Sequence, residues 1–227
     1  MQNVSIGQLW STAWERFKVH WVGGIGILVV GIILSIIPLI GPIFSLAIGP
    51  VLISYGLRAL ISSQSLPFGQ YFPSLGAVFK VIVGNILISL PGAIVYIVGL
   101  GSMIMPILSG DGYSEDFDTG IGGTSLFILV LGFILLVGAQ ILFYTYPLWI
   151  IDKSYGIFEG LGAAARLSMN NIGQIVVFLL SAMGINILGA IPCGIGLLVT
   201  VPMTVIATAG LYKGLIGEAA SQGKQGA

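Results

Sequence analysis

Charged residues are scarce in this chain, and their scarcity excludes a soluble globular protein. Only 7% of the 227 residues are charged and 56% are hydrophobic, whereas a soluble domain carries about 25% charged residues. Such a chain cannot cover its surface with polar groups, so lipid must be its solvent. The net charge of zero removes the electrostatic basis for binding nucleic acid.

Cysteine and histidine are almost missing as well. Cys193 is the only cysteine, so an intrachain disulfide and the usual metal-ligand spacings are excluded. His20 is the only histidine, and it follows an amphipathic segment beside Trp21. We expect it to contact lipid headgroups, and its imidazole is a weak candidate ligand for a haem or chlorophyll. No cofactor is predicted, although the chain leaves room for a bound lipid or pigment.

The chain contains long runs without any charged residue. No charge occurs from Val22 to Leu57, and one helix of that length would measure roughly 54 Å, far more than a ~30 Å hydrocarbon core. Two prolines flank a glycine in Pro38–Pro42, where a helix must stop. The run is therefore predicted to be a hairpin of two spans.

Further breaks at 102–124 and at Pro192–Gly194 complete the predicted fold class, an all-α polytopic transmembrane helical bundle formed by one domain, 1–227. All eight Lys and Arg residues then lie on one side. The positive-inside tendency predicts that both termini are cytoplasmic, with a cytoplasmic tail at 212–227. The expected location is a bacterial inner (plasma) membrane. The six spans are expected at 22–38, 43–57, 81–100, 125–146, 172–191 and 194–211.

The spans are expected to form three units, each an interfacial helix followed by a hairpin. The same spacing separates Pro38 from Gly56 and Pro192 from Gly210. Residues 1–21 have helical amphipathicity with tryptophan at the boundary, as in helices that lie in the headgroup plane. A weaker copy, "FGQYFPSLGAVFK", precedes the third span, and Phe158, Leu161, Ala165 and Met169 form an apolar face before the fifth.

These amphipathic segments have two interpretations. They anchor the protein on membrane lipids, or they dock a partner, which would be another integral membrane subunit. Tryptophan and arginine are the residue types that most often dominate binding energy. The candidate partner-contact residues of the first segment are Trp10, Trp14, Arg16 and Phe17.

The stretch "YPLWIIDKSYGIFEGLGAAARLSMNNIGQIVVF", with the ending "VPMTVIATAGLYKGL", resembles a known family. It is similar to uncharacterised bacterial integral membrane proteins related to the membrane domain of glycerophosphodiester phosphodiesterases. The specific identities lie between Pro147 and Leu215. The resemblance implies a six-span fold without an established activity, because the catalytic domain of the phosphodiesterases is missing here.

No predicted span contains Asp, Glu, Lys, Arg or His, which disfavours a proton- or ion-coupled transporter. The amides within the spans are expected to pack helices by hydrogen bonding or, alternatively, to line a lipid or solute cavity. Asn186 has small residues four positions to each side, a pattern that lets helices approach closely. The candidate packing residues are Asn85, Gln140, Ala182, Asn186 and Ala190.

The polar loop 102–124 carries the only carboxylates on the side opposite the basic residues. Carboxylates are preferred Ca²⁺ ligands, but the loop departs from the twelve-residue calcium motif and lacks its closing Glu. A solvated loop is the main interpretation and a weak cation site the alternative. The weak metal candidates are Asp111, Glu115, Asp116 and Asp118.

The sequence thus predicts a membrane protein that is not an enzyme, because no base stands near a nucleophile. The leading function is a structural or accessory subunit that packs within a larger membrane complex. The alternative is a transporter or channel for a lipid-like or small solute.

Overall fold

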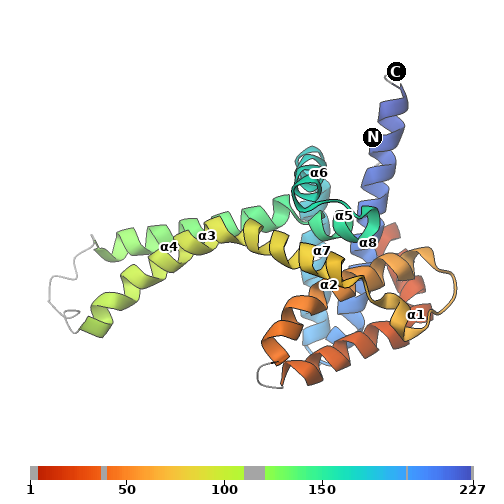
Figure 1. The fold of residues 1–227 in the computed structure, drawn as a ribbon, viewed down its shortest axis with the longest axis horizontal. Helices are drawn as coiled ribbons and strands as arrows, with labels where there is room; N and C mark the ends of the chain where they lie inside the picture. The colour runs from red at the N-terminus through yellow and green to blue at the C-terminus, as the bar shows by residue number, and fades with distance from the viewer. Residues whose placement is uncertain (1–4, 37–39, 110–120, 193, 226–227) are drawn as a thin grey trace.

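The computed structural model describes residues 5–36, 40–109, 121–192 and 194–225, and every regular element among them is helical. Figure 1 shows a body of packed helices and one long helical hairpin that extends from it. The elements are α1 (Ile6–Ser35), α2 (Ile40–Ile61), the 3₁₀ helix η1 (Phe68–Tyr71), α3 (Leu75–Ser109), α4 (Ile121–Leu142), α5 (Tyr146–Lys153), α6 (Ile157–Asn170), α7 (Ile172–Ala190) and α8 (Leu197–Gln225).

Helices α1, α2 and α8 pack against one another and form the centre of the body. They meet at Gly24, where a Cβ would lie 2.6 Å from the Tyr55 hydroxyl and 2.8 Å from the Pro202 Cβ. Glycine is required there because only a bare backbone permits this approach. The contact of α1 with α2 confirms that the long uncharged run forms a hairpin rather than a single helix.

Helices α7 and α8 form a second hairpin with a tight connection. Gly194 adopts φ +78°, a conformation that favours glycine, and its N–H donates to the Ala190 carbonyl oxygen at 2.9 Å. The break predicted at Pro192–Gly194 is therefore present, but α8 itself begins at Leu197 and not at Gly194.

Five helices of the described chain are long and apolar enough to cross a membrane, and Leu46–Ile61 within α2 is a shorter apolar helix. These segments agree with the predicted all-α membrane class. The five long ones are Ile6–Ser35, Leu75–Met105, Gly123–Lys153, Ile172–Ala190 and Leu197–Gly217.

Two predicted features of the three helix-plus-hairpin units are wrong. The expected interfacial helix 1–21 and the span 22–38 are not separate, because one continuous helix, α1, covers Ile6–Ser35 and no glycine–proline break or polar turn interrupts it. The "FGQYFPSLGAVFK" segment is not an interfacial helix, because Pro73 lies between η1 and α3. Only α6 forms the separate amphipathic helix that the repeat predicted.

The ends of several helices also differ from the boundaries that the sequence predicted. Helix α3 continues to Ser109 and α4 begins at Ile121, so the polar loop is shorter than 102–124. Helix α8 continues to Gln225, so most of the expected tail 212–227 is helical. In α3 the added residues 102–109 are mostly apolar, so they continue the apolar run of the helix.

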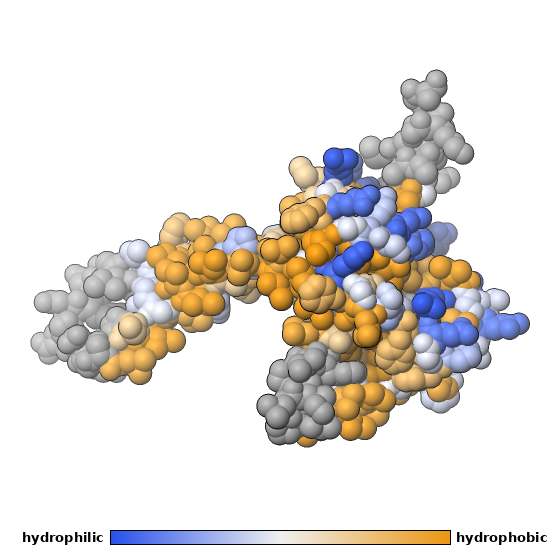
Figure 2. All heavy atoms as spheres, viewed as in Figure 1, coloured by the Kyte–Doolittle hydropathy of each residue, from blue (hydrophilic) through white to orange (hydrophobic). Residues whose placement is uncertain are grey.

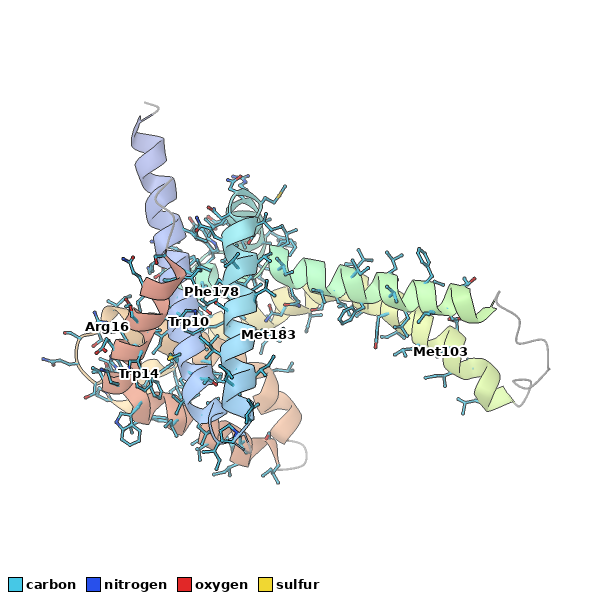
Figure 3. All side chains as sticks on the ribbon, turned by 180° about the vertical axis from the view of Figure 1, so that it is seen from behind. Trp10, Trp14, Arg16, Met103, Phe178 and Met183 are labelled. Atoms are coloured by element: carbon cyan, nitrogen blue, oxygen red, sulfur yellow. The ribbon has the colours of Figure 1, made fainter. Side chains whose placement is uncertain are left out.

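The α3–α4 hairpin separates into a base in the body and a free part. We call the free part the arm, formed by Ser89–Ser109 of α3 and Ile121–Gln140 of α4. Figures 1 and 3 show that the arm runs across the direction of α7 and α8. The arm helices are therefore not parallel to α7 and α8.

Candidate functional site

One face of α8 carries a line of polar side chains, and it is the most extensive polar feature inside the body. Thr200, Thr204, Thr208 and Tyr212 follow one another at intervals of four residues. Residues four apart lie on the same side of a helix, so the four side chains line up along α8. We call this row the α8 polar stripe.

The threonine hydroxyls of the stripe donate to the backbone of α8 itself. Thr204 Oγ1 donates to the Thr200 carbonyl oxygen at 2.7 Å, and Thr208 Oγ1 donates to the Thr204 carbonyl oxygen at 2.8 Å. This back-bonding uses the hydroxyl protons, so these two oxygens can only accept from other helices.

Neighbouring elements supply the matching donors. Asn186 Nδ2 on α7 donates to Thr204 Oγ1 at 3.1 Å and to the Ala182 carbonyl oxygen at 2.9 Å. The Tyr144 hydroxyl lies 2.8 Å from Thr208 Oγ1. Tyr144 is the donor of this bond, because the Thr208 proton is already used. The stripe thus joins α8 to α7 and to the segment between α4 and α5.

Asp152 of α5 closes the stripe at its other end. Its carboxylate accepts from Lys213 Nζ at 2.6 Å and from the Tyr212 hydroxyl at 3.3 Å. Lys153 Nζ lies 3.7 Å away, and the Asp152 side chain is only 13% exposed. A nearly buried carboxylate needs such partners, so this cluster fixes α5 against α8.

Two acceptors near the other end of the stripe have no hydrogen-bond partner among the described residues. They are Asn186 Oδ1 and Thr200 Oγ1, and both are buried. Thr200 Oγ1 lies against Gly189, whose Cβ would be 2.5 Å from it. The stripe therefore forms hydrogen bonds between helices, which serve packing. It also has two acceptors without a partner, which could bind a small polar molecule.

His20 is part of a second buried cluster, and both predictions for it are wrong. Its Nε2–H donates to the Ser62 carbonyl oxygen at 3.1 Å, so Nδ1 accepts from the Tyr71 hydroxyl at 2.9 Å. Burial raises the pKa of that hydroxyl, which keeps its proton available. His20 is 1% exposed because η1 folds over α1, and neither nitrogen is left for a headgroup or a metal.

The space beside His20 is also too small for a pigment. The pocket there has a volume of about 70 Å³ and is lined by His20, Gly23, Leu66, Phe68 and Tyr71. Sites for drug-sized ligands occupy about 300–1,000 Å³. The cluster therefore holds the 62–72 segment against α1. Within that segment the Leu66 N–H donates to the Tyr71 hydroxyl at 3.3 Å.

The predicted packing residues divide into two groups. Ala182 is buried and Asn186 bonds across α7 and α8, but Ala190 is exposed and Gly189 makes the close contact instead. Gln140 Nε2 donates to Ser89 Oγ at 3.1 Å across the base of the arm. Asn85 is exposed on α3, so its predicted packing contact is not formed. The misplaced residues lie on sides of α3 and α7 that no other helix covers.

The predicted partner-contact residues of α1 mostly face the body (Figure 3). Trp10 stacks on Phe178 with a centroid distance of 5.7 Å, and its Nε1 donates to Ser181 Oγ at 3.1 Å. Arg16 Nη1 donates to the Ser62 carbonyl oxygen at 2.9 Å, and Phe17 is 5% exposed. Only Trp14, 45% exposed, remains available to a partner.

The weak metal candidates lie outside the described residues. Asp111, Glu115, Asp116 and Asp118 belong to the segment between α3 and α4. Among the described residues, no group of three His, Cys, Asp or Glu side chains lies close enough to hold a metal ion.

Most of the α8 polar stripe was not predicted from the sequence. The signal was present in "TVPMTVIATAGLY", where threonine, threonine, threonine and tyrosine recur every fourth residue. Threonine is common in transmembrane helices, so the spacing alone does not identify the partners Tyr144 and Asp152. These come from a distant part of the chain.

Comparisons of this chain with protein-family models, curated proteins and solved structures found no match. None of them relates the chain to the membrane domain of glycerophosphodiester phosphodiesterases, so that resemblance stays a prediction.

Proposed function

We propose that this chain is a non-enzymatic multi-pass membrane protein that packs as an accessory subunit within a larger membrane assembly. The observation behind the proposal is the surface of the arm. Figure 2 displays a largely hydrophobic arm, with hydrophilic residues gathered over the body. Large apolar side chains point outward along both arm helices, among them Ile94, Ile97, Phe127, Phe133 and Ile134.

The polar groups of the body support a packing role over a chemical one. The hydroxyls of Thr204 and Thr208 donate their hydrogen bonds to backbone carbonyl oxygens of α8. His20 has a partner at each nitrogen, so it cannot serve as a base without breaking the 62–72 attachment. Asp152 is paired with Lys213.

We further propose six membrane crossings, with both termini in the cytoplasm of a bacterial cell. The charge asymmetry supports this orientation, since the loop between α3 and α4 has only acidic charges. Six crossings of one flat bilayer require the arm to turn relative to α7 and α8. Helical hydrogen bonding is interrupted at Pro91 and at Phe143–Thr145, so a turn would occur at these two places.

Thiol labelling tests the orientation. Ser114→Cys, in a Cys193→Ser background, should react with a membrane-impermeant reagent added to intact cells. A cysteine at Lys153 should react only after the membrane is opened. Labelling in the reverse order would overturn the proposed orientation.

Photo-crosslinking in native membranes tests the subunit role. A photoreactive residue at Phe133, 57% exposed on the arm, should give one discrete adduct with another membrane protein. The matched position Val22, 63% exposed on the body, should give little. If arm positions crosslink only to lipid, the arm does not contact a partner and the proposal fails.

The α8 polar stripe favours a second function, a transporter or channel for a lipid-like or small solute. Asn186 Oδ1 and Thr200 Oγ1 are buried acceptors that a passing solute would use. Thr200→Val in reconstituted vesicles should then reduce the flux of the solute while the melting temperature stays unchanged. A purified protein that carries no solute across vesicles would exclude this function.

A further inference from the structure

Helix α6 uses an unexpected face to pack into the body. Gly160, Ala164 and Leu167 are buried, and a Cβ at Gly160 would lie 2.9 Å from Ile150 Cδ1. The small residues Gly160 and Ala164 let α6 approach α5 closely. This packing face is distinct from the larger apolar face that the sequence displays.

The larger apolar face is uncovered at Phe158 and Met169, whereas Leu161 and Ala165 between them are half-buried, and Leu161 packs against the core. Phe158, Leu161, Ala165 and Met169 follow at helical spacing, so they form one stripe along α6. Phe158 is 80% exposed and Met169 is 67% exposed. We call these four residues the α6 outer stripe. In α1, by contrast, Trp10 and Phe17 of the corresponding apolar face are taken up by contacts inside the body.

Helix α6 lies where a membrane surface would be. It ends at Asn170, and α7, which is apolar and long enough to cross a membrane, begins at Ile172. Figures 1 and 3 show α6 at one end of α7 and seen nearly along its own axis, while α7 runs in the plane of the view. A bilayer crossed by α7 would therefore have α6 lying flat at its boundary.

The polar and charged residues of α6 also fit a helix that lies at a membrane surface. Arg166, Glu159 and Asn170 lie on the edge of α6 beside the outer stripe, and all three are exposed. A helix with one apolar stripe, a polar edge and a basic residue is typical of helices that lie in the headgroup plane. Arginine suits the phosphate of a lipid because its guanidinium offers paired donors.

We infer that the α6 outer stripe inserts into the headgroup–acyl boundary of a lipid leaflet, with Arg166 contacting lipid phosphate. Phe158 and Met169 enter the acyl region, and Glu159 remains in water. This inference goes beyond the proposed assembly role, because it concerns a surface of the body and does not depend on what the arm contacts.

Site-directed spin labelling of the full chain tests the inference. Phe158→Cys, Met169→Cys and the control Glu159→Cys would each be made in a Cys193→Ser background. The labelled protein is reconstituted in vesicles of phosphatidylcholine with a minor share of phosphatidylglycerol. The labels at 158 and 169 should be relaxed more by oxygen than by a water-soluble nickel chelate, and the label at 159 should show the reverse.

Two outcomes would overturn the inference. If the labels at 158 and 169 are as accessible to the nickel chelate as the label at 159, the stripe lies in water. If their shielding disappears on dilution with lipid, a second copy of the chain covers the stripe instead. Because Phe158 and Met169 are largely exposed, these substitutions should leave the fold intact, which an unchanged elution volume in detergent would verify.

A second variant isolates the phosphate contact. Arg166→Gln should reduce the depth of the label at 158 in the bilayer of vesicles that contain phosphatidylglycerol, because the guanidinium no longer holds α6 at the anionic surface. An unchanged depth would remove Arg166 from the proposed contact.

Discussion

The segment Gly123–Lys153, most of it in the arm, is more apolar than the body segment Leu197–Gly217, yet a much smaller share of its apolar stretch is buried. In the apolar 18-residue stretch of Leu197–Gly217 39% of the residues are buried inside the protein, whereas in that of Gly123–Lys153 only 6% are. The body encloses aromatic and polar side chains such as Tyr55, His20 and Tyr212. Of these two segments the more apolar one is therefore the less buried one, so its apolar surface faces outward and not into a core.

The contacts inside the two regions also differ in kind. The arm helices touch where glycine faces backbone: a Cβ at Gly99 would lie 2.6 Å from Leu129 N, and Gly132 lies against Tyr96. Such packing holds two helices together without filling a core. The arm is thus a self-contained hairpin whose outer surface needs lipid or a partner, while the body forms a core of its own.

The largest predicted effect concerns truncation. Deleting Gln2–Phe17 should prevent folding, because it removes the buried Ala13 and Phe17 and the Trp10 stack from the body. Expression and size-exclusion chromatography in mild detergent would measure the outcome.

The matched control is an arm deletion. Replacing 91–138 by a short glycine–serine linker should leave a folded body, because Ser89 and Gln140 are already joined by a 3.1 Å hydrogen bond. If the armless chain aggregates while the N-terminal deletion folds, the division into arm and body is wrong.

The second prediction contrasts two glycines. Gly56→Ala should destabilise the body by about 1–3 kcal/mol, the usual cost of overpacking. Its Cβ would lie 2.6 Å from the Val205 carbonyl oxygen, so α2 and α8 must separate. Gly138→Ala in the arm, where a Cβ meets nothing within 4 Å, should be neutral or stabilising. Thermal unfolding in detergent compares the two, and equal melting temperatures would contradict the α2–α8 packing.

The third prediction concerns the His20 cluster. Tyr71→Phe should cost about 1–3 kcal/mol, because it leaves His20 Nδ1 and the Leu66 N–H without their shared partner. Hydrogen–deuterium exchange should rise in residues 62–72 and stay unchanged in the arm. A rise confined to the arm would show that the cluster does not hold this segment.

Sequence reasoning located the helices but not their partners. Hydropathy and prolines predicted the α1–α2 and α7–α8 hairpins, because these signals are local. The burial of His20 depends on Tyr71 and Ser62, which lie far along the chain and reach it only through the fold. The amphipathic pattern of α6 likewise did not indicate which of its faces packs into the body. The buried face is the one with Gly160 and Ala164.

The fourth prediction tests the α8 polar stripe. Asn186→Leu should weaken the α7–α8 contact by about 0.6–2 kcal/mol, as expected for one hydrogen bond between helices in a membrane. The loss is modest because Thr204 Oγ1 keeps its bond to the Thr200 carbonyl oxygen. Steric trapping or thermal unfolding would measure it. A loss of solute flux at unchanged stability would instead support the transporter alternative.

The smallest predicted effect lies at the base of the arm, where Gln140 Nε2 donates to Ser89 Oγ. Both helices of the arm are held by glycine contacts, so this single bond should contribute about 0.6 kcal/mol or less, the average for interhelical hydrogen bonds in a membrane. A double-mutant cycle with Ser89→Ala and Gln140→Leu isolates it, because each change removes one partner without touching the glycines. A coupling energy well above that average would mean that a polar clamp, and not close backbone packing, joins the arm helices where they leave the body. The arm would then resemble the body in its chemistry, and the contrast between the two regions would reduce to the amount of surface that each leaves uncovered.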